Sequence, residues 1–277
     1  MPLPWALRGL LNGTLTTRYP GRSDPYLDGF AATVEVVGGR DPDPPGVLPT
    51  QEALDAVCPT GALHRSESGD PVVTVDRGAC IACGRCVLAY PEVFAWRRGA
   101  DVAALTRGAL VVPSADDTEE AVAAVRRALA DRVRGLRRSV HIRHVDAGSD
   151  GSDEWEVQAL LNPVYDVNRL GIFFTASPRH ADILLVTGVG APGMRAPLHR
   201  TREAMPDPVV VVAVGTDAVS GGLFRHGYGS SGGVGDLVDV DVWVPGSPAS
   251  PFSILHGLLL ALDRVPAERA PADGSDR

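Results

Sequence analysis

The sequence has no lysine, only four cysteines and no long apolar run. All 26 basic residues are arginine, and with 34 acidic residues the net charge at pH 7 is -8. This charge argues against nucleic acid as the main partner, because duplex binding depends on a basic face that neutralises phosphates. No apolar run approaches the roughly 20 residues that span a bilayer, and the first residues lack a secretory signal pattern. We therefore expect a cytoplasmic protein without a membrane-spanning helix.

The second half of the sequence has the pattern of a parallel sheet. Its apolar runs are separated by helix-length segments and lie at 171–176, 182–187, 209–214 and 238–244. The runs IleLeuLeuVal at 183–186 and ValValValVal at 209–212 show no alternation of apolar and polar residues, so both faces of these strands should be buried. Such strands are typical of parallel sheets that helices cover on both faces. The pattern therefore predicts an α/β fold.

The segment from Met1 to Leu11 is predicted to form one short amphipathic helix that stops at Asn12 and Gly13. Its tryptophan and leucines beside a single arginine suit two interpretations. The helix is either a frayed start of the chain or a surface helix that lies on a membrane or a partner.

A second helix is predicted from Ser114 onward, with an acidic first turn and apolar residues at helical spacing up to Leu136. Between residues 113 and 140 it would link two domains. It carries a basic stripe formed by Arg126, Arg127, Arg132, Arg134, Arg137 and Arg138. Such a stripe is either a solvated face or a docking surface for an acidic partner.

The four cysteines have the spacing of a metal centre. Three of them form Cys80-x-x-Cys83-x-x-Cys86, and Cys58 begins the segment CysProThrGlyAla. A C-x2-C-x2-C loop can wrap three corners of an iron-sulfur cube while a distant cysteine supplies the fourth thiolate. We therefore predict one 4Fe-4S cluster on these four residues. Zinc is the alternative, since it also accepts four cysteines, whereas disulfides are disfavoured in a cytosolic chain.

Residues 31–112 resemble the two-cluster bacterial ferredoxins. In that family each run C-x2-C-x2-C-x3-C-P gives three cysteines to one cluster and its last cysteine to the other. The ligands of one cluster would fall at Leu48, Gln51, Leu54 and Tyr90. These four ligands are lost together, while all four ligands of the other cluster remain. The resemblance therefore implies a small α+β ferredoxin-like domain with a single cluster.

Residues 141–265 resemble the small cluster-bearing subunit shared by respiratory complex I and the membrane-bound (group 4) nickel-iron hydrogenases, including formate hydrogenlyase. The segments that carry the resemblance are AsnProValTyrAsp at 162–166, SerProArgHisAlaAspIleLeuLeuValThrGly at 177–188, AlaMetProAspPro at 204–208, AlaValGlyThr at 213–216, SerGlyGlyLeuPhe at 220–224 and ValAspValTrpValProGly at 240–246. The resemblance implies a flavodoxin-like parallel sheet covered by helices.

These patterns divide the chain into five parts. We expect an N-terminal segment with a surface helix (1–30), the ferredoxin-like domain (31–112), the linker helix (113–140), the small-subunit domain (141–265) and a disordered tail (266–277).

The cysteines that hold the cluster of the small-subunit family are missing. The resemblance places them at Asp150, Asp153, Asp217 and Ser247, whereas the neighbouring Glu154 keeps the family pattern. Carboxylate and hydroxyl oxygens are poor substitutes for thiolate on an iron-sulfur cube, so we expect this second cluster to be lost. Two explanations of these four residues, called the Asp/Ser quartet below, stay open. Either it binds a hard cation such as Mg2+ or Ca2+, or polar residues fill the wet cavity that the cluster left.

A dinucleotide site is a further alternative. Gly188-x-Gly190-x-x-Gly193 follows the predicted strand at 182–187, and Asp217 ends the next strand. Glycines at this spacing admit a pyrophosphate, and the acid can bind a ribose. Pro192 is unusual in such a helix start, and the family resemblance already accounts for the loop. An NAD(H)-binding protein is therefore the less favoured interpretation.

The family resemblance implies an iron-sulfur electron-transfer subunit of a membrane-associated oxidoreductase complex, not catalytic alone. The alternative is a mainly structural subunit whose cube is retained for folding. Expected partners are a large-subunit homologue and membrane antiporter-like subunits, which would hold the chain peripherally on the cytoplasmic face of the membrane. Arg179 and His180, inside SerProArgHis, either line the interface with the large subunit or have a core or capping role.

Overall fold

The computed structural model describes residues 4–22, 24–37, 48–66, 72–113, 119–136 and 139–265. Three sequence predictions fall on residues outside these ranges. They are the disordered tail at 266–277, the start of the linker helix at Ser114, and two arginines of the basic stripe, Arg137 and Arg138.

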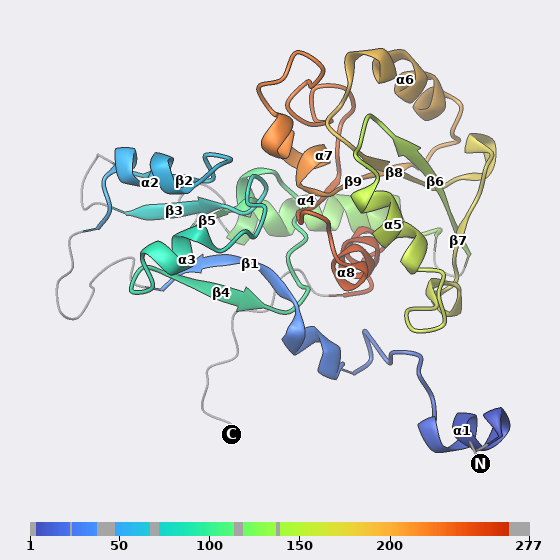
Figure 1. Cartoon of the computed structure of the whole chain (residues 1–277). Coiled ribbons are helices and arrows are strands. Elements are labelled where there is room, and N and C mark those ends of the chain that lie inside the picture. Colours follow the sequence, from blue (N-terminus) through green and yellow to red (C-terminus); the bar gives the residue numbers. More distant parts are fainter. Residues whose placement is uncertain are drawn as a thin grey trace.

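A five-stranded parallel sheet forms the centre of the larger part of the molecule (Figure 1). Its strands are β6 (Val140–Asp146), β7 (Ile172–Phe174), β8 (Ile183–Thr187), β9 (Val210–Val214) and β10 (Val242–Val244). Their order across the sheet is β10-β9-β8-β6-β7, and every neighbouring pair is parallel. Numbered from β6, this is the flavodoxin-like order 2-1-3-4-5. The predicted α/β class and the flavodoxin-like sheet are confirmed.

Helices cover both faces of this sheet. One apolar core joins Ile183 and Leu185 of β8 to residues of α4 (Glu119–Arg132), α5 (Ser152–Ala159) and α8 (Pro251–Ala261). A second core joins Leu184 and Val186, which point to the other face, to residues of α6 (Arg195–Glu203) and α7 (Thr216–Ser220). Successive strand residues point to opposite faces, so all of β8 is buried. This explains why its sequence shows no polar alternation.

Short 3-10 turns connect several of these elements. They are η3 (Val167–Leu170), η4 (Pro178–His180), η5 (Pro192–Met194) and η6 (Gly222–Phe224). The last helix, α8, is buried at every position. Its start is well defined, because the Ser250 side chain accepts a hydrogen bond from the Ser253 N–H and proline follows at the first helical position.

The smaller part of the molecule contains two antiparallel sheets, as the α+β prediction requires. β1 (Ala31–Val36) pairs with β4 (Phe94–Arg98), and β3 (Val73–Asp76) lies between β2 (Leu63–Arg65) and β5 (Val111–Val112). The remaining elements here are α2 (Gln51–Val57), α3 (Arg85–Ala89) and η2 (Gly108–Leu110). A separate core that includes Leu54, Val75 and Phe94 holds these elements together.

Several contacts join the two parts. The backbones of Ala104 and Trp243 form an isolated antiparallel bridge. The Thr216 hydroxyl of the larger part also donates to the Cys80 carbonyl of the smaller part at 3.2 Å. Within the smaller part, the Arg107 guanidinium donates two hydrogen bonds to the Asp76 carboxylate, at 2.8 and 2.6 Å. The chain begins with α1 (Trp5–Asn12) and η1 (Pro25–Gly29), and α1 lies apart from the rest in Figure 1. Within the described ranges, no helix combines the length and the apolar character needed to cross a membrane.

Candidate metal centre

The four cysteines line a single pocket in the smaller part. Cys58 caps the end of α2, Cys80 and Cys83 lie in the loop between β3 and α3, and Cys86 belongs to α3. All four thiols are free of disulfides. The structure places the distant Cys58, at the end of α2, in the same pocket as the triplet. That the four thiols bind one cluster stays a prediction.

Backbone N–H groups point at the sulfur atoms of this pocket. The Ala62 N–H donates to Cys58 Sγ at 3.1 Å, and the Ala82 N–H donates to Cys80 Sγ at 3.4 Å. Such bonds favour thiolate, and hydrogen bonds to the sulfurs also tune an iron-sulfur centre. Gly84 shapes the loop, because its φ is +73° and a Cβ there would lie 2.5 Å from the Trp96 ring.

Burial and the neighbouring thiols raise the pKa of two thiols in this pocket, Cys86 and Cys80. Burial raises the pKa of Cys86 to about 11, and charges on Cys80, Cys58 and Cys83 add to the shift. Burial also raises the pKa of Cys80. Four thiolates at one place repel one another unless they are protonated or share their charge with a cation, and as soft donors they fit a thiophilic metal group.

The Asp/Ser quartet lies at the carboxyl ends of strands in the larger part. Asp150 follows β6 and is exposed, and Asp153 begins α5 and is 3% exposed. Asp217 belongs to α7 and is half-buried, while Ser247 follows β10 and is exposed. This edge of an open α/β sheet is where ligands of such folds bind.

The buried Asp153 carboxyl has a strongly perturbed pKa. Burial raises its pKa to about 7, and the charge of Asp217 raises it further, against the effect of a hydrogen bond that Oδ1 accepts from the Ala249 N–H at 3.0 Å. Gly215 gives room for this side chain, because a Cβ there would lie 1.9 Å from Asp153 Oδ2. The pKa of Asp217 rises to about 6, mainly through burial.

Asp150 is in a different environment. Its Oδ1 accepts hydrogen bonds from the Ser152 hydroxyl at 2.6 Å and the Ser152 N–H at 2.9 Å, which lower the pKa of Asp150. Among the residues that the structure describes, no three His, Cys, Asp or Glu side chains are placed to hold one metal ion. The hard-cation explanation and the wet-cavity explanation of the quartet therefore both stay predictions.

The cysteine loop contacts the segments that carry the quartet. Thr216, next to Asp217, donates from its hydroxyl to the Cys80 carbonyl at 3.2 Å, and the same hydroxyl accepts from the Gly246 N–H at 3.2 Å. Ile81 shares a pocket with Ser247. No sequence pattern indicated this proximity, since Cys80 and Thr216 are 136 positions apart.

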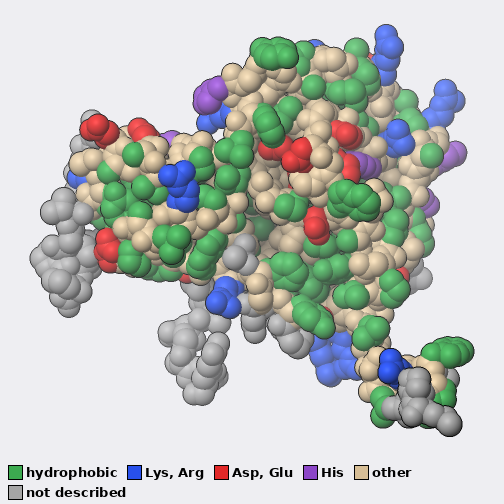
Figure 2. Space-filling view, in the orientation of Figure 1, with side chains coloured by type: hydrophobic (Ala, Val, Ile, Leu, Met, Phe, Trp, Pro, Cys, Tyr) green, Lys and Arg blue, Asp and Glu red, His purple; other side chains and the backbone are tan. Residues whose placement is uncertain are grey.

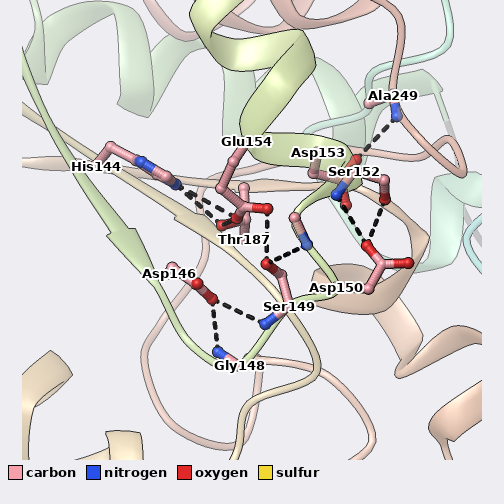
Figure 3. A network of polar contacts seen from close by, with 11 residues as sticks. His144, Asp146, Gly148, Ser149, Asp150, Ser152, Asp153, Glu154, Thr187 and Ala249 are labelled. Atoms are coloured by element: carbon pink, nitrogen blue, oxygen red, sulfur yellow. Dashed lines mark hydrogen bonds and ion pairs between the residues drawn. The ribbon is translucent and has the colours of Figure 1, made fainter.

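A partly buried polar network lies near Asp150 and Asp153 (Figure 3). Ser149 donates from its hydroxyl to Glu154 Oε2 at 2.6 Å, and Thr187 donates to Glu154 Oε1. His144 Nε2 lies 2.9 Å from the Thr187 hydroxyl, and burial lowers the pKa of His144. The sequence prediction included only Glu154 of this set. His144 and Thr187 were missed because isolated polar residues at strand positions carry no pattern of their own.

The remaining predicted residues have simpler surroundings. Arg179 and His180 are exposed in η4, which excludes a core role, and their interface role stays a prediction. Two of the three glycines of the dinucleotide-like motif lie against the chain's own backbone. A Cβ at Gly188 would lie 2.6 Å from the Gly148 carbonyl carbon, and one at Gly190 would lie 2.3 Å from the Gly233 oxygen, whereas one at Gly193 would meet nothing within 4 Å. The close approaches explain Gly188 and Gly190 without a pyrophosphate.

Two family models match the chain. The model described as NADH ubiquinone oxidoreductase, 20 Kd subunit, matches residues 151–261. The model described as 4Fe-4S single cluster domain matches residues 73–131. Among solved structures, the chain resembles part of the membrane-bound sulfane sulfur reductase, an archaeal respiratory membrane complex. That resemblance has a TM-score of 0.42 and 28% identity, over 48% of this chain and 74% of the other.

Three curated relatives carry names of the same kind. Formate hydrogenlyase subunit 7 of Escherichia coli strain K12 is 37% identical over 56% of this chain, which spans 60% of that relative's length. The probable membrane-bound hydrogenase subunit mbhJ of Pyrococcus furiosus is 37% identical over 53% of this chain and 91% of its own length. An NADH-quinone oxidoreductase subunit of Citrifermentans bemidjiense is 40% identical over 41% of this chain and 66% of its own length. The chain therefore belongs to the NADH ubiquinone oxidoreductase 20 kDa subunit family and joins it to a 4Fe-4S single cluster domain.

Proposed function

We propose that this chain is an iron-sulfur electron-transfer subunit of a membrane-associated oxidoreductase complex, with one 4Fe-4S cluster on Cys58, Cys80, Cys83 and Cys86. The observation that carries the proposal is the single pocket lined by all four free thiols. A cluster bound there supplies one-electron redox chemistry, and the chain's own part is to hold it and to donate N–H groups to its sulfurs.

The spacing of the cysteines favours a cube over zinc. Zinc also accepts four cysteines. A C-x2-C-x2-C loop with one distant cysteine is the pattern of a cube, in which each corner iron takes one thiolate. All four thiols line one pocket, which fits this assignment.

In this proposal the second cluster of the family is absent. The quartet offers only hard oxygen donors, and Asp153 is engaged with the Ala249 N–H. The cysteine loop, however, contacts the segments that carry Asp217 and Ser247. The remaining cube would therefore lie beside the place from which relatives pass electrons onward.

The expected partners are a large-subunit homologue and membrane antiporter-like subunits, which would place the chain at the cytoplasmic face of the membrane. The names of the relatives support this setting, since they are subunits of a hydrogenlyase, a membrane-bound hydrogenase and a quinone oxidoreductase. A mainly structural subunit is the second candidate. The Asp153 bond to the Ala249 N–H favours a structural role, because the chain's own hydrogen bond joins two segments that carry quartet residues.

The first experiment is anaerobic purification with iron, sulfide and zinc analysis. We expect a brown protein with about four irons per chain, and a colourless zinc-loaded product would rule out the proposed cofactor. Electron transfer is then tested in the assembled complex with Cys83→Ser, which removes one ligand, and with Leu88→Ser as an exposed control. Assembly without turnover in the cysteine variant supports electron transfer, whereas assembly with full turnover supports the structural role.

A further inference from the structure

Helix α1 exposes an unusual amount of apolar surface. Trp5 is 88% exposed, Leu10 79% and Leu11 74%, and Leu15 just after the helix is 65% exposed. Figure 2 shows apolar side chains around this helix at the lower right edge, away from the body of the molecule. Single exposed leucines are common, but adjoining ones in a short segment mark a contact surface.

The helix is amphipathic. Leu7, Leu10 and Leu11 are spaced at i, i+3 and i+4, so they share one face, while Arg8 and Asn12 share another. Eight residues rise about 12 Å, which is too short to cross a bilayer. Such a helix can lie in the plane of an interface, with leucines in the acyl boundary and tryptophan at the headgroups.

The charge of the segment differs from that of the rest of the chain. Residues 4–22 contain Arg8, Arg18 and Arg22 and no acidic residue, although the whole chain has a net charge of -8. All three arginines are exposed. An anionic bilayer has a negatively charged surface over an apolar interior. The arginines of this segment would be attracted to the surface, and its leucines would suit the interior.

The segment is also held to the body at a defined place. The Thr16 hydroxyl donates to the Pro163 carbonyl at 2.8 Å, and the Thr17 N–H donates to the Val164 carbonyl at 2.8 Å. The Arg169 guanidinium donates to the Tyr19 carbonyl. The helix therefore projects from one fixed end of the molecule and would fix the orientation of the chain on a surface.

We propose that α1, together with Leu15, Arg18 and Arg22, binds the surface of an anionic lipid bilayer directly. A protein groove would also cover the leucines, but the arginines without any acidic neighbour in the segment favour anionic lipid headgroups. The proposal does not depend on the cluster or on the proposed function. It adds a lipid contact made by this chain itself to the contacts expected through partners.

The test is flotation of the purified full-length chain with vesicles of phosphatidylcholine alone or with phosphatidylglycerol. We expect binding to the anionic vesicles, weakened by salt because the arginine contribution is screened. Leu10→Ser combined with Leu11→Ser should weaken binding about tenfold or more, since each leucine loses its burial in the acyl boundary. Arg18→Gln with Arg22→Gln should reduce the preference for anionic vesicles.

The matched control is Leu161→Ser with Leu223→Ser, which removes two leucines that are 48% and 58% exposed on the larger part. This variant should bind vesicles like the unmodified chain. The proposal is overturned if the unmodified chain binds neither kind of vesicle. That result would indicate that a protein partner covers the apolar face of α1. The proposal is equally overturned if the Leu10/Leu11 variant binds as well as the control, or if both vesicle types bind alike at low salt.

Discussion

Asp153→Asn should stabilise the protein at neutral and alkaline pH. The native Asp153 carboxyl, 3% exposed, keeps its proton up to a pKa of about 7, whereas the unfolded carboxyl loses it near 3.8. The native state therefore binds more protons between these values, and stability falls as the pH rises through this window. The asparagine has no charge to bury, and its side-chain oxygen can still accept from the Ala249 N–H.

The size of the effect follows from the shift in pKa. Between pH 5 and pH 8 the cost of keeping this carboxyl in the folded protein grows by roughly 2 to 3 kcal/mol. The advantage of the variant should grow by the same amount. For a domain of this size, that corresponds to about 5 to 10 °C in melting temperature.

The assay is thermal unfolding of both proteins at pH 5, 6, 7 and 8, under argon and at one scan rate, because cluster loss makes unfolding irreversible. We expect melting temperatures that diverge with pH. A constant difference would show that Asp153 titrates normally. The hard-cation site would instead be established by two results together: the variant is less stable than the unmodified protein at pH 8, and chelators destabilise the unmodified protein to the same extent.

Three further predictions concern the cluster, the quartet and an ion pair within the smaller part. Cys58→Ser should lower the bound iron and the visible absorbance of the purified protein, and undiminished iron would exclude this ligand. Gly215→Ala should destabilise the fold by about 1 to 3 kcal/mol or more, because the φ of Gly215 is +91° and the new Cβ would meet the Asp153 carboxylate. Gly193→Ala is the control, since its new Cβ would meet nothing within 4 Å, and the change in its unfolding free energy should be near zero in the same melting experiments. Arg107→Met should cost about 1 to 3 kcal/mol, since it leaves a mostly buried carboxylate without its two hydrogen bonds. Arg134→Met, at a solvent-exposed ion pair, is the control, and equal melting of the two arginine variants would contradict this account.

The central strands β8 and β9 could be predicted from the sequence because they are buried on both faces. β6, which is only partly buried, was not among the predicted runs. The runs at 182–187 and 209–214 became β8 and β9 with ends that differ by one residue. The run at 238–244 was longer than its strand, which begins only at Val242. Asp241 explains the difference. Its side chain, and not a backbone carbonyl, accepts the hydrogen bond from the Val211 N–H, so the regular pairing with β9 starts only after Asp241.

The partners of the basic stripe could not be predicted. Arg126 forms an ion pair with Asp263 at 3.0 Å, and Arg132 pairs with Asp241. The stripe is therefore neither wholly solvated nor wholly available for docking. Helical spacing shows which arginines share a face, but it contains no information about acids more than a hundred positions away. The contact between Thr216 and Cys80 could not be predicted for the same reason.

Hydrogen bonds of the protein itself join the segments that carry the quartet. The Asp153 side chain, at the start of α5, accepts from the Ala249 N–H after β10, and the Thr216 hydroxyl of α7 accepts from the Gly246 N–H. These bonds would hold this edge of the sheet together if the second cluster is absent, as we propose. Burial raises the pKa of Asp153, so this edge accommodates a protonated acid more readily than a carboxylate.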